Sequence, residues 1–125
     1  MSVALNTRQI GDVSIVDVSG RITLGEGSSK LRNAIRTMAS EGHLKIIVNL
    51  AETTYIDSSG LGVLVSALAT VTSQGGKLKL MNVIARVKDL LLITKLYTVF
   101  DVFDDERSAI WSYTGAPIAE PAART

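Results

Sequence analysis

The sequence predicts an α/β domain in which a mixed sheet of about five strands carries about four to five helices. Three observations lead to this fold class. Two stretches rich in β-branched residues open the chain around a Gly11-Asp12 turn, strand-like and helix-like segments alternate after them, and glycines follow the expected helices. The opening pair predicts a hairpin. The later alternation favours parallel strands joined by right-handed crossovers.

The expected elements follow from the pattern of apolar and turn residues. In chain order they are strands at 3–10, 13–18, 44–50, 77–83 and 99–103, and helices at 29–41, 59–73, 84–95 and 104–113. With 125 residues in all, one domain is expected over residues 1–113. Residues 114–125, which contain two prolines among small residues, are expected to form a flexible tail.

The first half of the chain provides the hairpin, a helix and a central strand. β-branched residues favour extended backbone on both sides of the Gly11-Asp12 turn. The helix expected from Ser29 to about Glu41 has a cap near Ser28 or Ser29, and its apolar residues recur at spacings of three and four. Gly42 ends this helix, and the apolar run 44–50 predicts a mostly buried strand.

The second half continues the alternation. Apolar residues at helical spacing predict a helix over 59–73, which Gln74-Gly75-Gly76 ends. The strand at 77–83 should lie parallel to the strand at 44–50, with this helix between them. A third helix at 84–95, a short strand and a last helix complete the domain.

The most informative segment is Ile56-Asp57-Ser58-Ser59-Gly60-Leu61-Gly62-Val63-Leu64, which we call the switch segment. An Asp or Ser before an apolar run is first of all a helix N-cap, which accepts hydrogen bonds from N–H groups that have no partner inside the helix. These N–H groups and the helix dipole also attract negative charge. A phosphate on a hydroxyl here would meet such donors, but it would lie beside Asp57 and on a surface without a compensating cation. This conflict predicts a binding switch.

Simpler roles stay open for the same residues. From spacing alone, Ser58 and Ser59 are more often helix caps than modification sites, and Asp57 is a candidate cap for the same helix. Gly60 and Gly62 form a Gly-x-Gly that lacks the third glycine of a dinucleotide-binding loop. Nucleotide binding is therefore weakly supported by the residues.

Composition excludes several classes of function. The chain has no Cys and one His, which excludes disulfides, thiolate chemistry and metal sites built from several His or Cys ligands, so neither metal nor cofactor is expected. Thirteen Lys and Arg against 12 Asp and Glu give a net charge of +1, which supports binding neither to nucleic acid nor to an anionic membrane. No basic leader precedes an apolar core, and the uncharged run 58–76 is too interrupted to span a bilayer. We therefore expect a cytoplasmic protein.

The switch segment, preceded by Ile47-Val48-Asn49-Leu50 and followed by Gly75-Gly76-Lys77-Leu78, closely resembles the STAS domain of bacterial anti-sigma-factor antagonists. The resemblance covers roughly residues 3–113 and implies a STAS-like fold and a partner-switching module without catalysis of its own. In that family the unmodified protein binds an anti-sigma factor, which is also a serine kinase of the histidine-kinase-like ATPase fold, and this frees the sigma factor. The kinase phosphorylates the Ser that follows the Asp, here Ser58, and a PP2C-type phosphatase reverses the modification.

One loop departs from the family pattern. Family members commonly carry an acidic residue soon after the Gly that ends the second strand, whereas Arg21-Ile22-Thr23 follows Gly20 here. We expect the loop 21–27 to flank Ser58 at one edge of the sheet. Arg21 would then partly neutralise Asp57 and would hold a phosphate through charge-assisted hydrogen bonds.

The uncharged run 58–76 also predicts an apolar helix face in contact with solvent, on the side of Val63, Ser66, Ala67 and Thr70, because such faces commonly mark interaction sites. The expected partner-binding residues belong to this face, to the switch segment and to the preceding loop: Asp57, Ser59, Gly60, Gly62, Val63, Ser66, Ala67, Thr70, Arg21 and Thr23.

Two alternative functions stay open. One is a structural STAS subunit, either of a stress-signalling scaffold or of a lipid-transport ABC complex. The other is a small hydrolase in which Ser58 or Ser59 is the nucleophile. Such an enzyme would have His43 as its only imidazole base. We therefore expect the chain not to be an enzyme.

Overall fold

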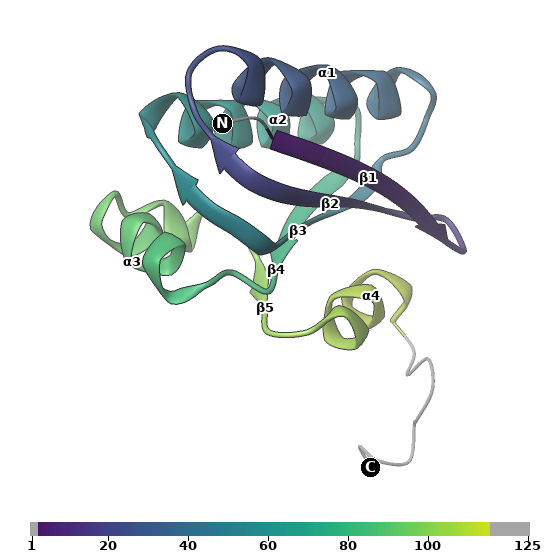
Figure 1. Cartoon of the computed structure of the whole chain (residues 1–125). Helices are drawn as coiled ribbons and strands as arrows, with labels where there is room; N and C mark the ends of the chain where they lie inside the picture. Colours follow the sequence, from purple (N-terminus) through teal and green to yellow (C-terminus); the bar gives the residue numbers. More distant parts are fainter. Residues whose placement is uncertain (1–2, 116–125) are drawn as a thin grey trace.

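The chain forms a five-stranded mixed sheet with helices on both faces (Figure 1). The computed structural model describes residues 3–115. Its elements are, in chain order, β1 (Val3–Ile10), β2 (Val13–Ile22), α1 (Glu26–Ser40), β3 (Lys45–Ile56), α2 (Ser58–Ser73), β4 (Lys77–Met81), α3 (Ala85–Ile93), the 3₁₀-helix η1 (Leu96–Thr98), β5 (Val102–Phe103) and α4 (Glu106–Thr114). The α/β fold class that the sequence predicts is confirmed.

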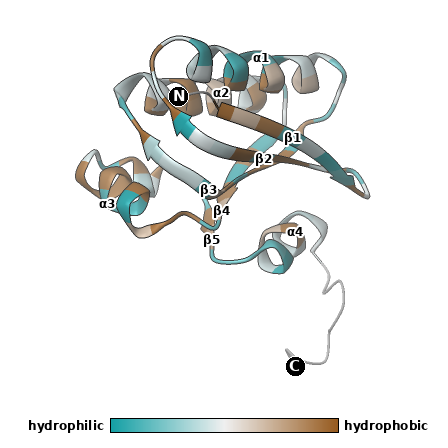
Figure 2. Ribbon diagram, in the orientation of Figure 1, coloured by the Kyte–Doolittle hydropathy of each residue, from teal (hydrophilic) through white to brown (hydrophobic). Residues whose placement is uncertain are grey.

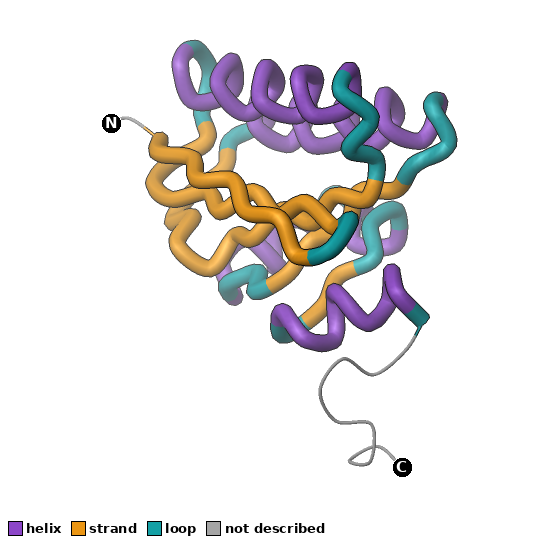
Figure 3. Tube along the Cα trace, turned by 90° about the vertical axis from the view of Figure 1, so that its right-hand side faces the viewer, coloured by secondary structure: helices purple, strands orange, loops and turns teal. Residues whose placement is uncertain are grey.

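The strands lie across the sheet in the order β1-β2-β3-β4-β5. β1 and β2 form the expected antiparallel hairpin, and the other neighbours pair in parallel. The crossover helices α1 and α2 lie side by side on one face of the sheet (Figure 3). Because β2 and β3 run in the same direction, the loops that follow both strands meet at one edge, and this edge holds the switch segment.

β2 and β3 are longer than the apolar pattern predicts. β2 continues to Ile22 and β3 to Ile56, beyond the expected ends at Val18 and Leu50. Register irregularities interrupt their pairing, and the buried Thr53 hydroxyl donates to the Val18 carbonyl oxygen at 3.0 Å. A bulged strand with polar side chains is missed by a pattern that counts apolar residues.

α1 begins earlier than expected and without the predicted cap. The N-cap is Gly25, which makes no side-chain capping bond, and the first helical residue is Glu26 instead of Ser29. Ser28 is buried inside the helix, where its hydroxyl donates to the Thr23 carbonyl oxygen at 2.8 Å. This bond ties α1 to the loop that reaches the switch segment.

Two hydrophobic cores hold the layers together. The larger core lies between the sheet and the helices α1 and α2, and it also includes Val87 and Leu91 of α3. The smaller core lies under α4 on the opposite face and consists of Val13, Ile15, Ile47, Met81, Ala109 and Ile110. Much of α3 is hydrophobic (Figure 2), and Leu92 and Ile93 on this helix are exposed.

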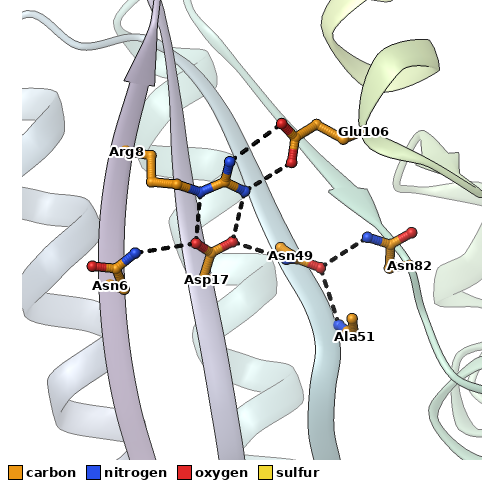
Figure 4. A network of polar contacts seen from close by, with 7 residues as sticks. All are labelled: Asn6, Arg8, Asp17, Asn49, Ala51, Asn82 and Glu106. Atoms are coloured by element: carbon orange, nitrogen blue, oxygen red, sulfur yellow. Dashed lines mark hydrogen bonds and ion pairs between the residues drawn. The ribbon is translucent and has the colours of Figure 1, made fainter.

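A polar network on the α4 face connects the hairpin to the last helix (Figure 4). Arg8 on β1 contacts both Asp17 on β2, at 2.7 Å, and Glu106 at the start of α4, at 2.8 Å. Asn49 donates to Asp17 at 2.8 Å and accepts from Asn82 at 3.1 Å, which extends the network to β3 and to the residue after β4. The Arg8 guanidinium lowers the pKa of Asp17 below its ordinary value.

The last helix ends one residue into the segment that the sequence predicts as a tail. Thr114 is the last residue of α4, and Gly115 follows it in the left-handed conformation. The remainder of the tail expected over 114–125 lies outside the described residues. No helix within residues 3–115 has the length and apolar character needed to cross a membrane.

Gly60 allows α2 to approach the ends of β2 and β3. A Cβ at this position would collide with the Ile22 carbonyl oxygen and would lie 2.7 Å from Cγ2 of Ile56. By contrast, a Cβ at Gly62 would meet nothing within 4 Å. The two glycines of the switch segment therefore have different roles, since only Gly60 is required by packing.

We expect Asp17→Asn to destabilise the domain at neutral pH, by about 1–3 kcal/mol, because the substitution removes a charge-assisted hydrogen-bonded pair. The pKa of Asp17 is lower in the folded protein than in the unfolded chain. Its contribution to the free energy of unfolding is therefore present above the unfolded-state pKa and is lost as pH falls through the native pKa. Urea unfolding at about pH 7 and at about pH 3 should show that the difference in free energy of unfolding between wild type and variant is smaller in acid. Asp12→Asn, at an exposed pair with Lys45, is the control and should change stability little. A difference independent of pH would contradict this prediction.

A second pair of variants tests the glycine roles. We expect Gly60→Ala to lower the free energy of unfolding by about 1–3 kcal/mol, because the added methyl group has no room beside Ile22 and Ile56. Gly62→Ala should instead be neutral or stabilising by up to about 1 kcal/mol, since alanine favours helix and the site is open. Thermal unfolding of both variants measures their stability relative to wild type. Equal effects of the two substitutions would refute the different roles of the two glycines.

Candidate partner-binding site

Asp57 organises the start of α2. It is the N-cap residue, and its carboxylate accepts hydrogen bonds from the N–H of Gly60 at 2.9 Å and from the N–H of Leu24 at 3.0 Å. Its own N–H donates to the Ile22 carbonyl oxygen at 3.2 Å. Hydrogen bonds from backbone N–H groups, first from Gly60 and then from Leu24, lower the pKa of Asp57. One carboxylate thus joins the end of β3, the helix start and the loop after β2.

Ser58 is the first residue of α2, and its side chain is exposed. Among residues 3–115 the Ser58 hydroxyl has no hydrogen-bond partner, because Asp57 supplies the cap. The interpretation of Ser58 or Ser59 as the helix cap is therefore wrong. Ser59 is half-buried beside Ser58, which leaves Ser58 as the more accessible hydroxyl of the pair.

The helix face expected to contact solvent is partly wrong. Val63 and Ala67 are buried, with 3% and 7% of their surface exposed, because this side of α2 packs beside α1. Ser66 is exposed and Thr70 is half-buried. Before the last turn of α2, whose Thr72 and Ser73 are also exposed, the solvent-facing residues recur at intervals of three and four and form what we call the outer stripe: Ser58, Gly62, Ser66 and Ala69. The helix is apolar on the sides that face the sheet and α1, and small and uncharged on the third.

The loop after β2 lies against the switch segment, as expected, but Arg21 does not reach Asp57. Its guanidinium stacks on the Tyr55 ring, 4.6 Å from the ring centroid, and Asp57 is held by backbone N–H groups instead. The predicted neutralisation of Asp57 by Arg21 is therefore wrong. Thr23 is half-buried and accepts hydrogen bonds from Ser28.

Two depressions flank the start of α2. The α2–α3 groove, with a volume of about 690 Å³, is lined by Tyr55, Ile56, Asp57, Ser58 and Leu61 and by Arg86, Val87, Asp89, Leu90, Ile93 and Thr94 of α3. The α1–α2 hollow, with a volume of about 430 Å³, is lined by Leu24, Gly25, Ser28, Ser29, Arg32, Ser59, Gly62, Val63 and Ser66. Arg32 and Arg86 are absent from the expected partner-binding residues because they reach the site from α1 and α3. Leu24 lies in the loop 21–27 expected beside Ser58, but it is not among the expected binding residues; its side chain is 78% exposed.

The geometry does not favour the hydrolase alternative. His43 precedes β3 and lies 3.3 Å from Gln9, whereas Ser58 follows the other end of that strand. At roughly 3.3 Å per residue, the 12 residues of β3 separate the two ends by about 40 Å. The described residues contain no group of three or more His, Cys, Asp or Glu side chains able to hold a metal ion.

Comparison with known proteins identifies the family. The STAS domain family model matches residues 4–109. The anti-sigma-B factor antagonist of Bacillus subtilis is 31% identical over 102 residues, which cover 82% of this chain and 92% of the relative. An anti-sigma factor antagonist from Mycobacterium paratuberculosis has a solved structure that matches with a TM-score of 0.79 at 19% identity, over 89% of this chain and 93% of that one.

SpoIIAA has been solved in two states that both share this fold. The structure of the unphosphorylated anti-sigma factor antagonist matches with a TM-score of 0.68 and 19% identity, over 90% of this chain and 99% of that one. The structure of the phosphorylated form from Bacillus matches with a TM-score of 0.70 and 19% identity, over 88% of this chain and 99% of that one. These likenesses concern the fold, and the family follows from the STAS domain match and from the relative in Bacillus subtilis. The chain therefore belongs to the STAS domain family, and its relatives include anti-sigma factor antagonists.

Proposed function

We propose that this chain is an anti-sigma-factor antagonist, a regulatory module that binds an anti-sigma factor when Ser58 is unmodified and thereby frees a sigma factor. The observation that carries the proposal is the exposed Ser58 at the first position of α2, where the outer stripe begins. Because Asp57 caps the helix, the Ser58 hydroxyl does not take part in capping. The relatives named as anti-sigma factor antagonists support the same function.

The outer stripe fits a protein partner better than a substrate. Its residues are small and uncharged, so another helix can approach α2 closely. No imidazole lies beside Ser58, because His43 is at the far end of β3, and the module is therefore proposed to have no catalysis of its own. The family resemblance names the enzymes that would act on it: a serine kinase of the histidine-kinase-like ATPase fold, which is the anti-sigma factor itself, and a PP2C-type phosphatase. With such partners, the module is proposed to act in the cytoplasm.

Phosphorylation would act through local charge. A phosphate carries about −1.5 to −2 charge at neutral pH, and on Ser58 it would lie next to the Asp57 carboxylate. In an interface, a charge desolvated against a like charge costs roughly 2–5 kcal/mol. That cost corresponds to roughly 30-fold to several thousand-fold weaker binding, since each 1.4 kcal/mol is about tenfold. The cap bonds of Asp57 would keep α2 in place in both states.

We expect the cognate kinase and ATP to phosphorylate Ser58 and not Ser59, and we expect Ser58→Asp to bind the anti-sigma factor at least about 30-fold more weakly than wild type. Mass spectrometry maps the phosphate, and calorimetry measures the dissociation constants. Ser58→Ala is the control: it should bind like wild type and accept no phosphate. Wild-type affinity in Ser58→Asp, or phosphate found only on Ser59, would favour the constitutive STAS subunit instead.

The outer stripe can be tested without altering charge. We expect Ser66→Phe to weaken partner binding by about 10-fold, because a large side chain in a closely packed contact costs roughly 1–3 kcal/mol. Ser66 is exposed, so the thermal midpoint should stay within a few degrees of wild type. Thr37→Phe, at an exposed position of α1 outside both depressions, is the matched control and should bind normally. Normal binding by Ser66→Phe would remove the stripe from the interface.

A further inference from the structure

Three arginines surround the start of α2. Arg86 lines the α2–α3 groove together with Ser58, and Arg32 lines the α1–α2 hollow together with Ser59 and Gly62. Arg21 stands over Tyr55, which itself lines the groove that contains Ser58. The three side chains come from β2, α1 and α3, and each lies against a residue of the edge where β3 ends and α2 begins.

None of these arginines is neutralised within the described part of the chain. The ion pairs among residues 3–115 involve Arg8, Lys30, His43 and Lys45 as the basic partners. Two carboxylates line the α2–α3 groove, but Asp57 is held by backbone N–H groups, and Asp89 forms no ion pair with Arg86. The rim of the site therefore carries three guanidinium groups that form no ion pair among residues 3–115.

The centre of this rim is uncharged. It consists of the outer stripe and of Leu24, whose side chain is 78% exposed. A small, uncharged centre that a partner can approach closely, within a charged rim that includes arginine, fits the anatomy of a protein interface. A nucleic acid would instead require a continuous basic surface, and the net charge of +1 leaves little for one.

We propose that the protein partner presents an acidic face to this site, with carboxylates that pair with Arg21, Arg32 and Arg86 around a contact on the outer stripe. The inference rests on the proposed function and adds the chemistry of the partner to it. Complementary charge at the rim accelerates association and makes it sensitive to ionic strength. It also excludes partners with a basic face.

The same arginines give phosphorylation a second route to release the partner. A phosphate on Ser58 would share the α2–α3 groove with Arg86, and guanidinium groups bind phosphate through charge-assisted, often bidentate hydrogen bonds. The phosphate would then compete with a carboxylate of the partner for Arg86 while repelling the acidic face. Release would come from occupation of the arginine as well as from repulsion.

The test uses the full chain and its cognate anti-sigma factor. Arg21→Glu, Arg32→Glu and Arg86→Glu should each weaken binding by about 10-fold or more, mainly through slower association, and wild-type affinity should fall as NaCl rises from about 50 to about 500 mM. Arg107→Glu on α4, which packs on the opposite face of the sheet, is the matched charge reversal and should bind within about twofold of wild type. Thermal unfolding checks that all four variants are folded.

The outcomes separate this inference from the proposed function. If Ser58→Asp releases the partner while all three arginine variants bind like wild type, the switch stands and the acidic face is refuted. If the arginine variants lose the partner while Ser58→Asp binds normally, the acidic face stands and the switch fails. Arginine-dependent binding to duplex RNA or to vesicles with an anionic lipid, without any effect on the protein partner, would also refute the inference.

Competition for Arg86 has its own readout. If a negative group at residue 58 pairs with Arg86, the loss of affinity caused by Ser58→Asp should be smaller in an Arg86→Gln background than in wild type. Equal losses in both backgrounds would show that the charge at residue 58 acts by repulsion alone and would remove Arg86 from the release mechanism. Arg107→Gln is the background in which no such coupling is expected.

Discussion

The capping bond of Asp57 is the interaction on which the site depends. The carboxylate accepts hydrogen bonds from N–H groups of two segments that are far apart in the sequence, the helix start at Gly60 and the loop at Leu24. A serine cap would use its hydroxyl oxygen to accept such a bond, and that hydroxyl would then be held against the backbone. Because an aspartate takes this role one residue earlier, Ser58 can stand at the head of the helix with its hydroxyl in solvent.

The position of α2 between its neighbours determines which of its residues a partner can touch. The sheet takes one side of the helix and α1 takes a second, so only one narrow strip of side chains faces outward. Gly60 tightens this arrangement, since its missing side chain allows contact with the ends of β2 and β3. Small residues on the remaining side leave the backbone of the helix close to solvent. A helix so enclosed offers a partner little more than its first turns and the outer stripe.

The sequence predicted the fold class and most elements because both depend on local patterns, but it did not predict the faces of α2. A helix that carries no charge on any side gives no clear signal of which side meets α1, so Val63 and Ala67, which the sequence predicts to contact solvent, are buried. The lengths of β2 and β3 were missed for a related reason, because polar residues such as Thr53 are buried by hydrogen bonds and not by hydrophobicity. Arg32 and Arg86 reach the site only through tertiary packing, which no spacing along the chain reveals.

A net charge of +1 conceals two different arrangements of charge in two parts of the domain. On the α4 face, Arg8 is neutralised by Asp17 and Glu106, and the network that contains them joins the hairpin to the last helix. Around α2, three arginines have no such partners in the described part of the chain. Paired charges stabilise the fold and are little affected when another protein binds. Unpaired charges cost little while water solvates them, and they contribute most to binding when a partner of opposite charge contacts them. Under the proposed switch, a phosphate on Ser58 would change the charge only at the edge where α2 begins, and the ion pairs of the α4 face would keep the domain folded while the partner leaves.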